Sequence, residues 1–216
     1  MCGRFSASYP PSLLEETYAA TVVDEPPPPK WNVAPTDPVC IVVQRERREV
    51  RTVRWGLIPS WADDRRIASR LINARAETLA EKPAFRAALA RRRCLVPADG
   101  WYEWRQKQPF FIHAKSGGPV AFAGLYEVWR DPATEELVRT CAVVTTSACA
   151  ELKELHTRMP VVLGPAAWDE WLDPAQDDVQ GLLVPCEGFD AYPVSPLVNS
   201  VRNDGPSLLE PLPALF

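Results

Sequence analysis

The chain has 216 residues, 46% of them hydrophobic, which is enough for one domain with a substantial apolar core. It contains no apolar run long enough to cross a bilayer and no charged-then-apolar signal sequence, so we expect a cytoplasmic protein and no membrane partner. The net charge is −4, but residues 1–115 carry 19 basic and 13 acidic side chains, whereas residues 116–216 carry 5 and 15.

Short apolar runs separated by prolines and charged turns predict more strands than helices. A short capped helix is predicted after Pro10, a polyproline connector at residues 26–29, and a hairpin of residues 40–43 and 50–55 around a charged turn. Residues 67–75 are ambiguous. Further strands are predicted at residues 94–96, 110–112, 120–123 and 138–145, and further helices at residues 82–92 and 165–172.

These elements predict an α+β fold in which residues 1–216 form a single domain. Strands outnumber helices, and 23 prolines disfavour long helices, so we expect a mainly antiparallel, barrel-like β core flanked by short helices. Most tryptophans are expected in the core, namely Trp55, Trp129, Trp168 and Trp171.

The second residue carries the most distinctive chemistry of the chain. Because Cys2 is small, removal of Met1 is expected, which leaves an α-amine and a thiol on adjacent carbons. Both groups titrate near pH 8, at about 7.7–8.0 and 8.5, so both have nucleophilic fractions at neutral pH. Such a pair traps an aldehyde as a Schiff base that the thiol closes into a thiazolidine, or attacks a carbonyl with the amine as base. A frayed terminus without chemistry is the alternative.

The other cysteines and the histidines give no sign of a metal site. The six cysteines form no CxxC pair, and apart from Cys2 they lie among apolar or small residues, which is typical of reduced core cysteines. Only His113 and His156 are present, which argues against a histidine-rich metal site, and no cofactor is expected. His113 is interpreted as structural or surface-exposed, whereas His156 lies in a loop-like segment better suited to a site.

Three further segments hold polar or aromatic residues suited to chemistry or to nucleic-acid binding. Glu103 lies between two large aromatic residues that can desolvate its carboxylate and raise its pKa. Asn73 and Arg75 share a face if their segment is a strand. Trp61 follows a turn and could stack on an exposed base. A surface glutamate, a capped turn and a core tryptophan are the respective structural alternatives.

The arginines of the basic half suit phosphate recognition through their planar guanidinium groups. A solvated, salt-bridged surface gives the same composition, and the segment from Arg45 to Arg51 is interpreted as such a surface because Glu46 and Glu49 lie within it. Charge alone therefore leaves a nucleic-acid partner open.

Taken together, seven ordered segments closely resemble the SOS-response-associated peptidase family, whose members shield abasic sites by covalent attachment. They are residues 1–5 (MCGRF), 31–35 (WNVAP), 55–59 (WGLIP), 72–77 (INARAE), 98–104 (ADGWYEW), 155–160 (LHTRMP) and the region from residue 193. Each segment is weak alone, but the ordered set with cysteine at position 2 is highly specific.

The resemblance implies a mixed α/β domain around a barrel-like sheet and a catalytic set of Cys2, Asn73, Glu103 and His156. Cys2 would crosslink to the ring-opened aldehyde of an abasic site, and Asn73 would orient the amine or the sugar. Glu103 would move protons during imine formation and ring closure, and His156 would assist at the sugar oxygen.

The resemblance also implies a DNA-binding surface. Arg4, Arg75 and Arg158 would bind flanking phosphates, Trp61 and Trp104 would pack against bases or sugars, and Asn32 and Pro35 would help to form the cleft. The implied partner is single-stranded DNA, or a single-strand/double-strand junction, with an abasic site. We expect a monomer that associates with the nucleoid when bound, with weak lyase character and self-removal of Met1. Some bacterial relatives have two consecutive tryptophans where this chain has Trp61-Ala62, and one lost stacking ring is worth about 1–3 kcal/mol.

Two other functions remain alternatives. Glutamine amidotransferases also begin Met-Cys-Gly, so an N-terminal-nucleophile amidohydrolase is possible, although the glycine- and asparagine-rich oxyanion segments of those enzymes are not recognisable here. A non-covalent single-strand DNA-binding module would use the arginines and tryptophans and would be indifferent to Cys2. The sequence contains no recognisable catalytic triad of a separate protease.

Overall fold

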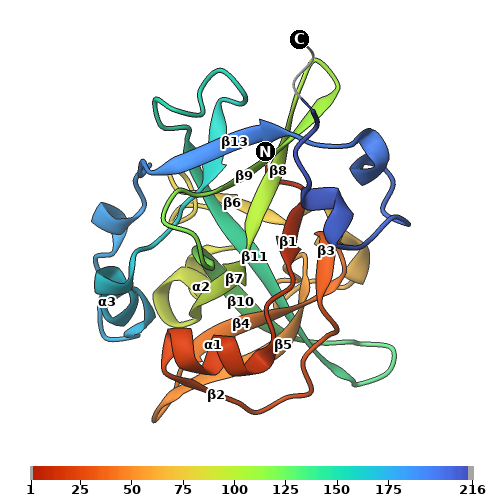
Figure 1. Cartoon of the computed structure of the whole chain (residues 1–216). Helices are drawn as coiled ribbons and strands as arrows, with labels where there is room; N and C mark the ends of the chain where they lie inside the picture. Colours follow the sequence, from red (N-terminus) through yellow and green to blue (C-terminus); the bar gives the residue numbers. More distant parts are fainter. Residues whose placement is uncertain (1, 214–216) are drawn as a thin grey trace.

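Five strands close into a barrel in the computed structural model, which describes residues 2–213. They are β4 (Pro38–Gln44), β5 (Arg48–Trp55), β7 (Arg93–Ala98), β10 (Val120–Arg130) and β11 (Leu137–Ser147). The strands pair antiparallel in the order β11-β10-β7-β4-β5, and a parallel pairing of β5 with β11 completes the ring (Figure 1). The predicted α+β fold with a mainly antiparallel, barrel-like core is confirmed.

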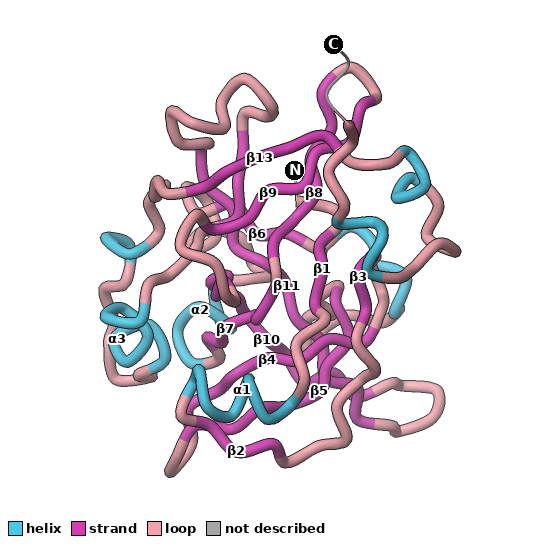
Figure 2. The backbone as a smooth tube through the Cα atoms, viewed as in Figure 1, coloured by secondary structure: helices cyan, strands magenta, loops and turns pink. Residues whose placement is uncertain are grey.

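A second, antiparallel sheet lies against one end of this barrel. It has the order β13 (Phe189–Pro193), β9 (Gln108–Ala114), β8 (Gly100–Arg105), β1 (Phe5–Ala7) and β3 (Lys30–Val33). Only Asp99 separates β7 of the barrel from β8 of this sheet. Three short strands extend the barrel. They are β2 (Ala20–Val22) along β5 and β6 (Asn73–Arg75) along β11 (Figure 2), and β12 (Arg158–Pro160), which also pairs with β11.

The helices are short, as the proline content predicts. They are α1 (Pro11–Tyr18), α2 (Arg86–Arg91) and α3 (Trp168–Leu172), with 3-10 turns at Arg65–Arg70, Pro165–Ala167, Gln180–Leu182, Pro196–Asn199 and Pro206–Leu209. Residues 82–92 are predicted to be helical throughout, but the helix covers only Arg86–Arg91. Pro83 disfavours helical backbone at Lys82, and residues 83–85 form turns that lead into the helix. The ambiguous residues 67–75 resolve into the end of a 3-10 turn followed by β6.

Alternate residues of the barrel strands pack in two directions. Val42, Leu95 and Leu125 face outward and are covered by side chains of α1, α2 and α3. The barrel residues that alternate with them face inward and pack in one cluster with Phe5 and Trp101 of the second sheet. These inward-facing residues include Ile41, Val53, Phe122, Cys141 and Val143. The ring of Phe122 lies 5.9 Å from the rings of both Phe5 and Trp101, so aromatic side chains fill the end of the barrel where β1 and β8 meet it.

The burial of the tryptophans and most of the cysteines agrees with the sequence-based prediction. Trp55, Trp129, Trp168 and Trp171 are buried, as expected. All six cysteines are free; Cys94, Cys141 and Cys149 are buried as predicted, whereas Cys40 and Cys186 are only half-buried.

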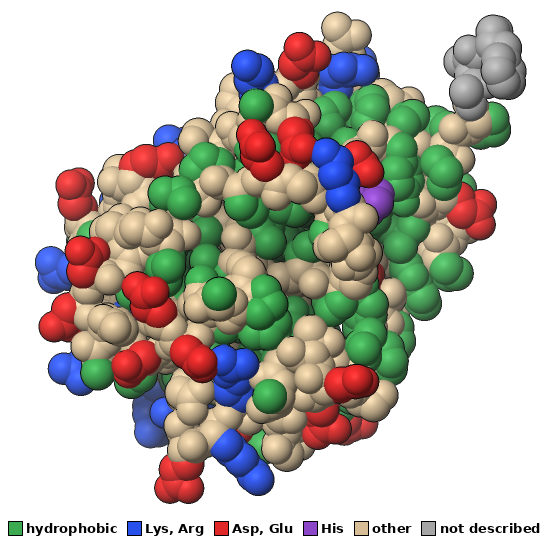
Figure 3. All heavy atoms as spheres, turned by 60° about the vertical axis from the view of Figure 1, so that its left-hand side comes forward, with side chains coloured by type: hydrophobic (Ala, Val, Ile, Leu, Met, Phe, Trp, Pro, Cys, Tyr) green, Lys and Arg blue, Asp and Glu red, His purple; other side chains and the backbone are tan. Residues whose placement is uncertain are grey.

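The barrel strands of the two halves form two adjacent groups, β7, β4 and β5 from residues 1–115 and β10 and β11 from residues 116–216. One face of the molecule shows acidic and basic side chains interspersed, with hydrophobic side chains gathered towards the right of the view (Figure 3). None of the helices in residues 2–213 has the length and apolar character needed to span a bilayer.

Candidate active site

The segment that carries Cys2 leads directly into β1 and is anchored by it. Phe5 pairs with Val33 of β3 and Trp101 of β8, and its ring packs edge-on against Trp55 at 4.8 Å. Cys2 itself has no exposed surface. Burial and the negative charge of Glu103 raise the pKa of its thiol, so the buried sulfur is held in its protonated form at neutral pH.

Asn73 holds the Cys2 backbone. The three-residue strand β6 places Asn73 opposite Val143 of β11, and the Asn73 Nδ2 donates a hydrogen bond of 2.7 Å to the Cys2 carbonyl oxygen. The Asn73 Oδ1 is buried and accepts no hydrogen bond from residues 2–213. A buried acceptor without a donor is costly. The geometry therefore leaves an acceptor next to Cys2 that an amine or a hydroxyl group can satisfy.

Glu103 and His156 form a pair beside Cys2. Glu103 is buried on β8, and burial raises the pKa of its carboxyl group to about 7. The His156 Nε2 lies 3.9 Å from the Glu103 Oε2, and burial lowers the pKa of His156. The Arg158 backbone N–H donates to the His156 Nδ1 at 2.9 Å, so the neutral ring carries its proton on Nε2, towards Glu103. This arrangement places two proton-transfer groups next to the terminal segment, and the pKa of one of them, Glu103, is about 7.

The predicted phosphate-binding arginines differ in their surroundings. Arg4 donates to Asn32 Oδ1 at 2.8 Å and to the Val198 carbonyl at 2.9 Å, so Arg4 and Asn32 hold the segment around residues 198–203. The Arg158 guanidinium contacts both carboxylate oxygens of Glu77, and its NH2 group also donates to the carbonyl of Thr145 at 2.6 Å. Arg75 is exposed on β6 and forms no ion pair with the described residues.

The predicted aromatic contacts lie on two different elements. Trp61 follows Pro59 and Ser60, and 59% of its surface is exposed. Trp104 is half-buried on β8, and its Nε1 donates to Asn199 Oδ1 at 2.7 Å. Pro35 is half-buried in the turn between β3 and β4. The structure thus gathers the predicted catalytic residues tightly, and the predicted DNA contacts lie on several elements.

Position 62, at which the resemblance implies a second tryptophan in some bacterial relatives, is an alanine that packs against the protein. Ala62 is 8% exposed and belongs to a small cluster with Ile58, Ala68 and Trp129. Its carbonyl also accepts a hydrogen bond of 2.6 Å from Trp129 Nε1. The side chain at this position therefore faces the protein, whereas the neighbouring Trp61 faces solvent.

Sequence reasoning assigned no role to two residues that support the site. Glu77 fixes the Arg158 guanidinium, and Asn199 fixes the Trp104 ring. Their partners lie 81 and 95 residues away in sequence, so no local pattern could have indicated these contacts. Within residues 2–213, no cluster of histidine, cysteine, aspartate or glutamate side chains has the geometry for a metal ion.

The fold is a β-barrel in which Asn73, Glu103 and His156 lie close to Cys2 in the terminal segment. The chain belongs to the SOS response associated peptidase (SRAP) family, whose model matches residues 1–201, as the motifs predicted. It is 41% identical to the abasic site processing protein YoqW of Bacillus subtilis (strain 168), with 97% of this chain and 99% of YoqW covered.

Other relatives and a solved structure extend the comparison. The chain is 33% identical to the abasic site processing protein YedK of Escherichia coli (strain K12), over 98% of this chain and 100% of YedK. It is 31% identical to the abasic site processing protein HMCES of Mus musculus, over 98% of this chain and 76% of HMCES. A crystal structure of a Bacteroides thetaiotaomicron protein superimposes with a TM-score of 0.87 at 26% identity, over 98% of this chain and 100% of that one.

Proposed function

We propose that this protein captures abasic sites in DNA covalently through Cys2, and that the adduct shields the lesion during the response to DNA damage. The observation that carries the proposal is the hydrogen bond from Asn73 to the Cys2 carbonyl, which fixes the terminal segment beside the Glu103–His156 pair. The names of YoqW, YedK and HMCES support the same substrate.

The chemistry requires removal of Met1, because only a free Cys2 amine can form an imine. The amine adds to the C1′ aldehyde of the ring-opened sugar, and loss of one water gives the imine. The Cys2 sulfur then bonds to the same carbon, and the imine nitrogen takes up a proton as the thiazolidine ring closes. The ring lacks the imine's route to β-elimination, which favours protection over strand cleavage. Since Cys2 is fully buried, the groups that cover it must move to admit the sugar, while the hydrogen bond from Asn73 keeps the terminal segment in place.

The neighbouring side chains have distinct proposed roles. Asn73 Oδ1 accepts a hydrogen bond from the new amine and keeps it beside the sugar. Glu103, with its pKa raised to about 7, exchanges protons with the carbinolamine and the imine at neutral pH. His156 donates from Nε2 to the sugar oxygen. Holding the amine, the thiol and the carboxyl group around one carbon supplies the proximity that the step needs.

Several finer properties belong to the same proposal. We infer a preference for single-stranded DNA or a single-strand/double-strand junction, with Arg75 and Trp61 as the contacts most exposed to solvent. Arg4, Arg158, Trp104, Asn32 and Pro35 are proposed to shape the cleft around the lesion, although the two arginines also hold protein groups. A monomeric, cytoplasmic protein with weak lyase character and self-removal of Met1 completes the proposal.

A denaturing gel tests the proposal. The wild-type protein, with its Cys2 terminus verified by mass, is incubated with a single-stranded oligonucleotide that contains one abasic site. A heat-stable shifted band is expected with the wild type and with Cys186→Ala, a control that removes another free thiol, and none with Cys2→Ala. Equal bands from wild type and Cys2→Ala would contradict capture through Cys2. Binding without any covalent band would favour the non-covalent alternative, and glutaminase activity the amidohydrolase.

A further inference from the structure

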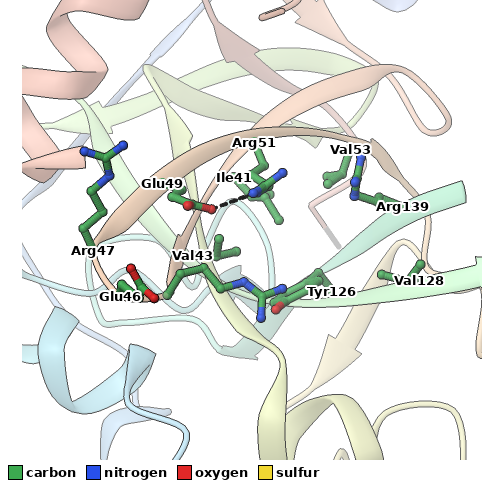
Figure 4. Close-up of a pocket in the computed structure, with 11 residues that line it drawn as sticks. Ile41, Val43, Glu46, Arg47, Glu49, Arg51, Val53, Tyr126, Val128 and Arg139 are labelled. Atoms are coloured by element: carbon green, nitrogen blue, oxygen red, sulfur yellow. Dashed lines mark hydrogen bonds and ion pairs between the residues drawn. The ribbon is translucent and has the colours of Figure 1, made fainter. Parts of the chain in front are cut away.

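A cavity lies at the end of the barrel opposite the Cys2 site. It has a volume of about 620 Å³ and is lined by residues of β4, β5, the turn between them, β10 and β11 (Figure 4). The β4–β5 hairpin and the β10–β11 hairpin both turn at this end of the barrel, so β4 and β10 end there and β5 and β11 begin there. Arg139 of β11 lines the cavity, whereas Val143, four residues further along β11, pairs with Asn73, which contacts Cys2. At about 3.3 Å per residue, these two positions on β11 are about 13 Å apart.

The floor of this cavity is apolar. Ile41, Val43 and Val53 are buried inward-facing residues of the barrel, and Tyr126 and Val128 of β10 form the adjoining wall. Burial raises the pKa of Tyr126, and the charge of Arg45 acts in the opposite direction, which places that guanidinium near the phenol. An apolar group that enters the mouth would therefore contact these aliphatic side chains and the adjoining Tyr126 ring.

The rim of the cavity carries an excess of positive charge. Four arginines and two glutamates line it. Arg51 is paired with Glu49 at 2.8 Å and with Asp24 at 3.5 Å, as expected for the salt-bridged surface that the sequence predicts. The other three arginines, Arg45, Arg47 and Arg139, form no ion pair with any residue among 2–213. The prediction of a paired surface therefore holds for Arg51 and for Arg48, which pairs with Asp169. It does not hold for Arg45 and Arg47, so within the described residues three arginines border the cavity without an ion pair, against the one unpaired carboxylate of Glu46.

We propose that this mouth binds a nucleotide unit, either free or as part of a single strand. The phosphate would contact Arg45 and Arg139, whose planar forks match phosphate oxygens, whereas Arg47 lies beyond Glu46 and Glu49 on the other side of the cavity (Figure 4). The base would lie on the apolar floor. The cavity volume falls within the range of about 300–1,000 Å³ that is typical of small-ligand sites. The site is separate from Cys2 and does not depend on the abasic-site chemistry.

Calorimetric titration of the full-length protein with dATP tests this inference. The variant R45A/R139A removes two unpaired rim charges from exposed positions. The control R86A/R91A removes the same charge from exposed positions on α2, outside the cavity. We expect dATP to bind the wild type and the control equally and R45A/R139A at least tenfold more weakly. Circular dichroism verifies that both variants are folded, and covalent capture of a short abasic oligonucleotide is expected to persist in both.

Two further probes identify the source of the phosphate. If R45A/R139A binds a single-stranded 12-mer more weakly than the control does, while dATP shows no difference, the site binds a nucleotide within a strand and not a free nucleotide. The proposal then holds for single-stranded DNA. If inorganic phosphate binds as tightly as dATP, the apolar floor contributes nothing and the nucleotide assignment is wrong. Absence of binding by dATP and the 12-mer, or equal weakening in both double variants, would overturn the proposal.

Discussion

Replacing Glu103 by glutamine should stabilise the fold at high pH. Glu103 is buried, and its pKa is raised from 4.5 to about 7 by burial. The folded protein therefore holds this proton more tightly than the unfolded chain does. Below pH 4.5 the carboxyl group is neutral in both states and costs nothing. As the pH rises from 4.5 through 7, the unfolded chain ionises first, and stability falls.

The size of this effect follows from the shift. The pKa of Glu103 differs from its ordinary value by roughly 2.5 units, each worth about 1.4 kcal/mol. Wild type is then penalised by about 3 kcal/mol at pH 8 and by about 1 kcal/mol at pH 5. Glutamine has nearly the shape of the neutral acid and does not ionise. The variant Glu103→Gln should therefore gain about 2 kcal/mol relative to wild type between pH 5 and pH 8.

Urea unfolding at pH 5 and pH 8 measures the difference. The titration of His156 is present in both proteins, so much of its contribution cancels when the two unfolding free energies are subtracted. Glu81→Gln removes one carboxyl group at an exposed position and controls for the change in net charge. A stability difference between Glu103→Gln and wild type that does not change with pH would refute the reasoning. The same variant is expected to slow covalent capture, because its amide cannot exchange a proton.

Three further substitutions test the core, the second sheet and the DNA contact. Phe122→Ala empties the aromatic end of the barrel and should cost about 3–5 kcal/mol in urea unfolding; a loss below 1 kcal/mol would show that the cavity collapses. Gly100→Ala places a methyl group 2.7 Å from the Phe111 ring and closer still to the Ile112 carbonyl. The melting temperature should therefore drop by several degrees, and an unchanged melting temperature would be inconsistent with this packing. Trp61→Ala should weaken binding to single-stranded DNA by about 1–3 kcal/mol in fluorescence anisotropy, and equal affinity would exclude stacking by this ring.

Local patterns predicted the strands well because each strand is a short apolar run bounded by turn residues. The hairpin of β4 and β5 was visible in the sequence, since its apolar strands flank a charged turn. Closure of the barrel was only suggested, because it depends on the parallel pairing of β5 with β11, where Trp55 meets Cys141. Residues so distant in sequence leave no local signal of their contact.

The candidate site shows the same limit. Asn73 could not be assigned to a strand, because the three residues of β6 are ordered by pairing with β11 and not by their own pattern. The motifs named Glu103 and His156, but their contact joins a strand and a loop 53 residues apart. Burial of Cys2 was also not predictable, since it depends on how Phe5 enters the barrel end.

The most direct test of covalent capture is the mass of the N-terminal tryptic peptide after reaction with an abasic oligonucleotide and digestion of the DNA. The account predicts that Cys2–Gly3–Arg4 carries the sugar remnant with the loss of one water, and that the Cys2 thiol no longer reacts with iodoacetamide. An unmodified peptide with a reactive Cys2 thiol, together with DNA attached to a lysine elsewhere, would contradict it.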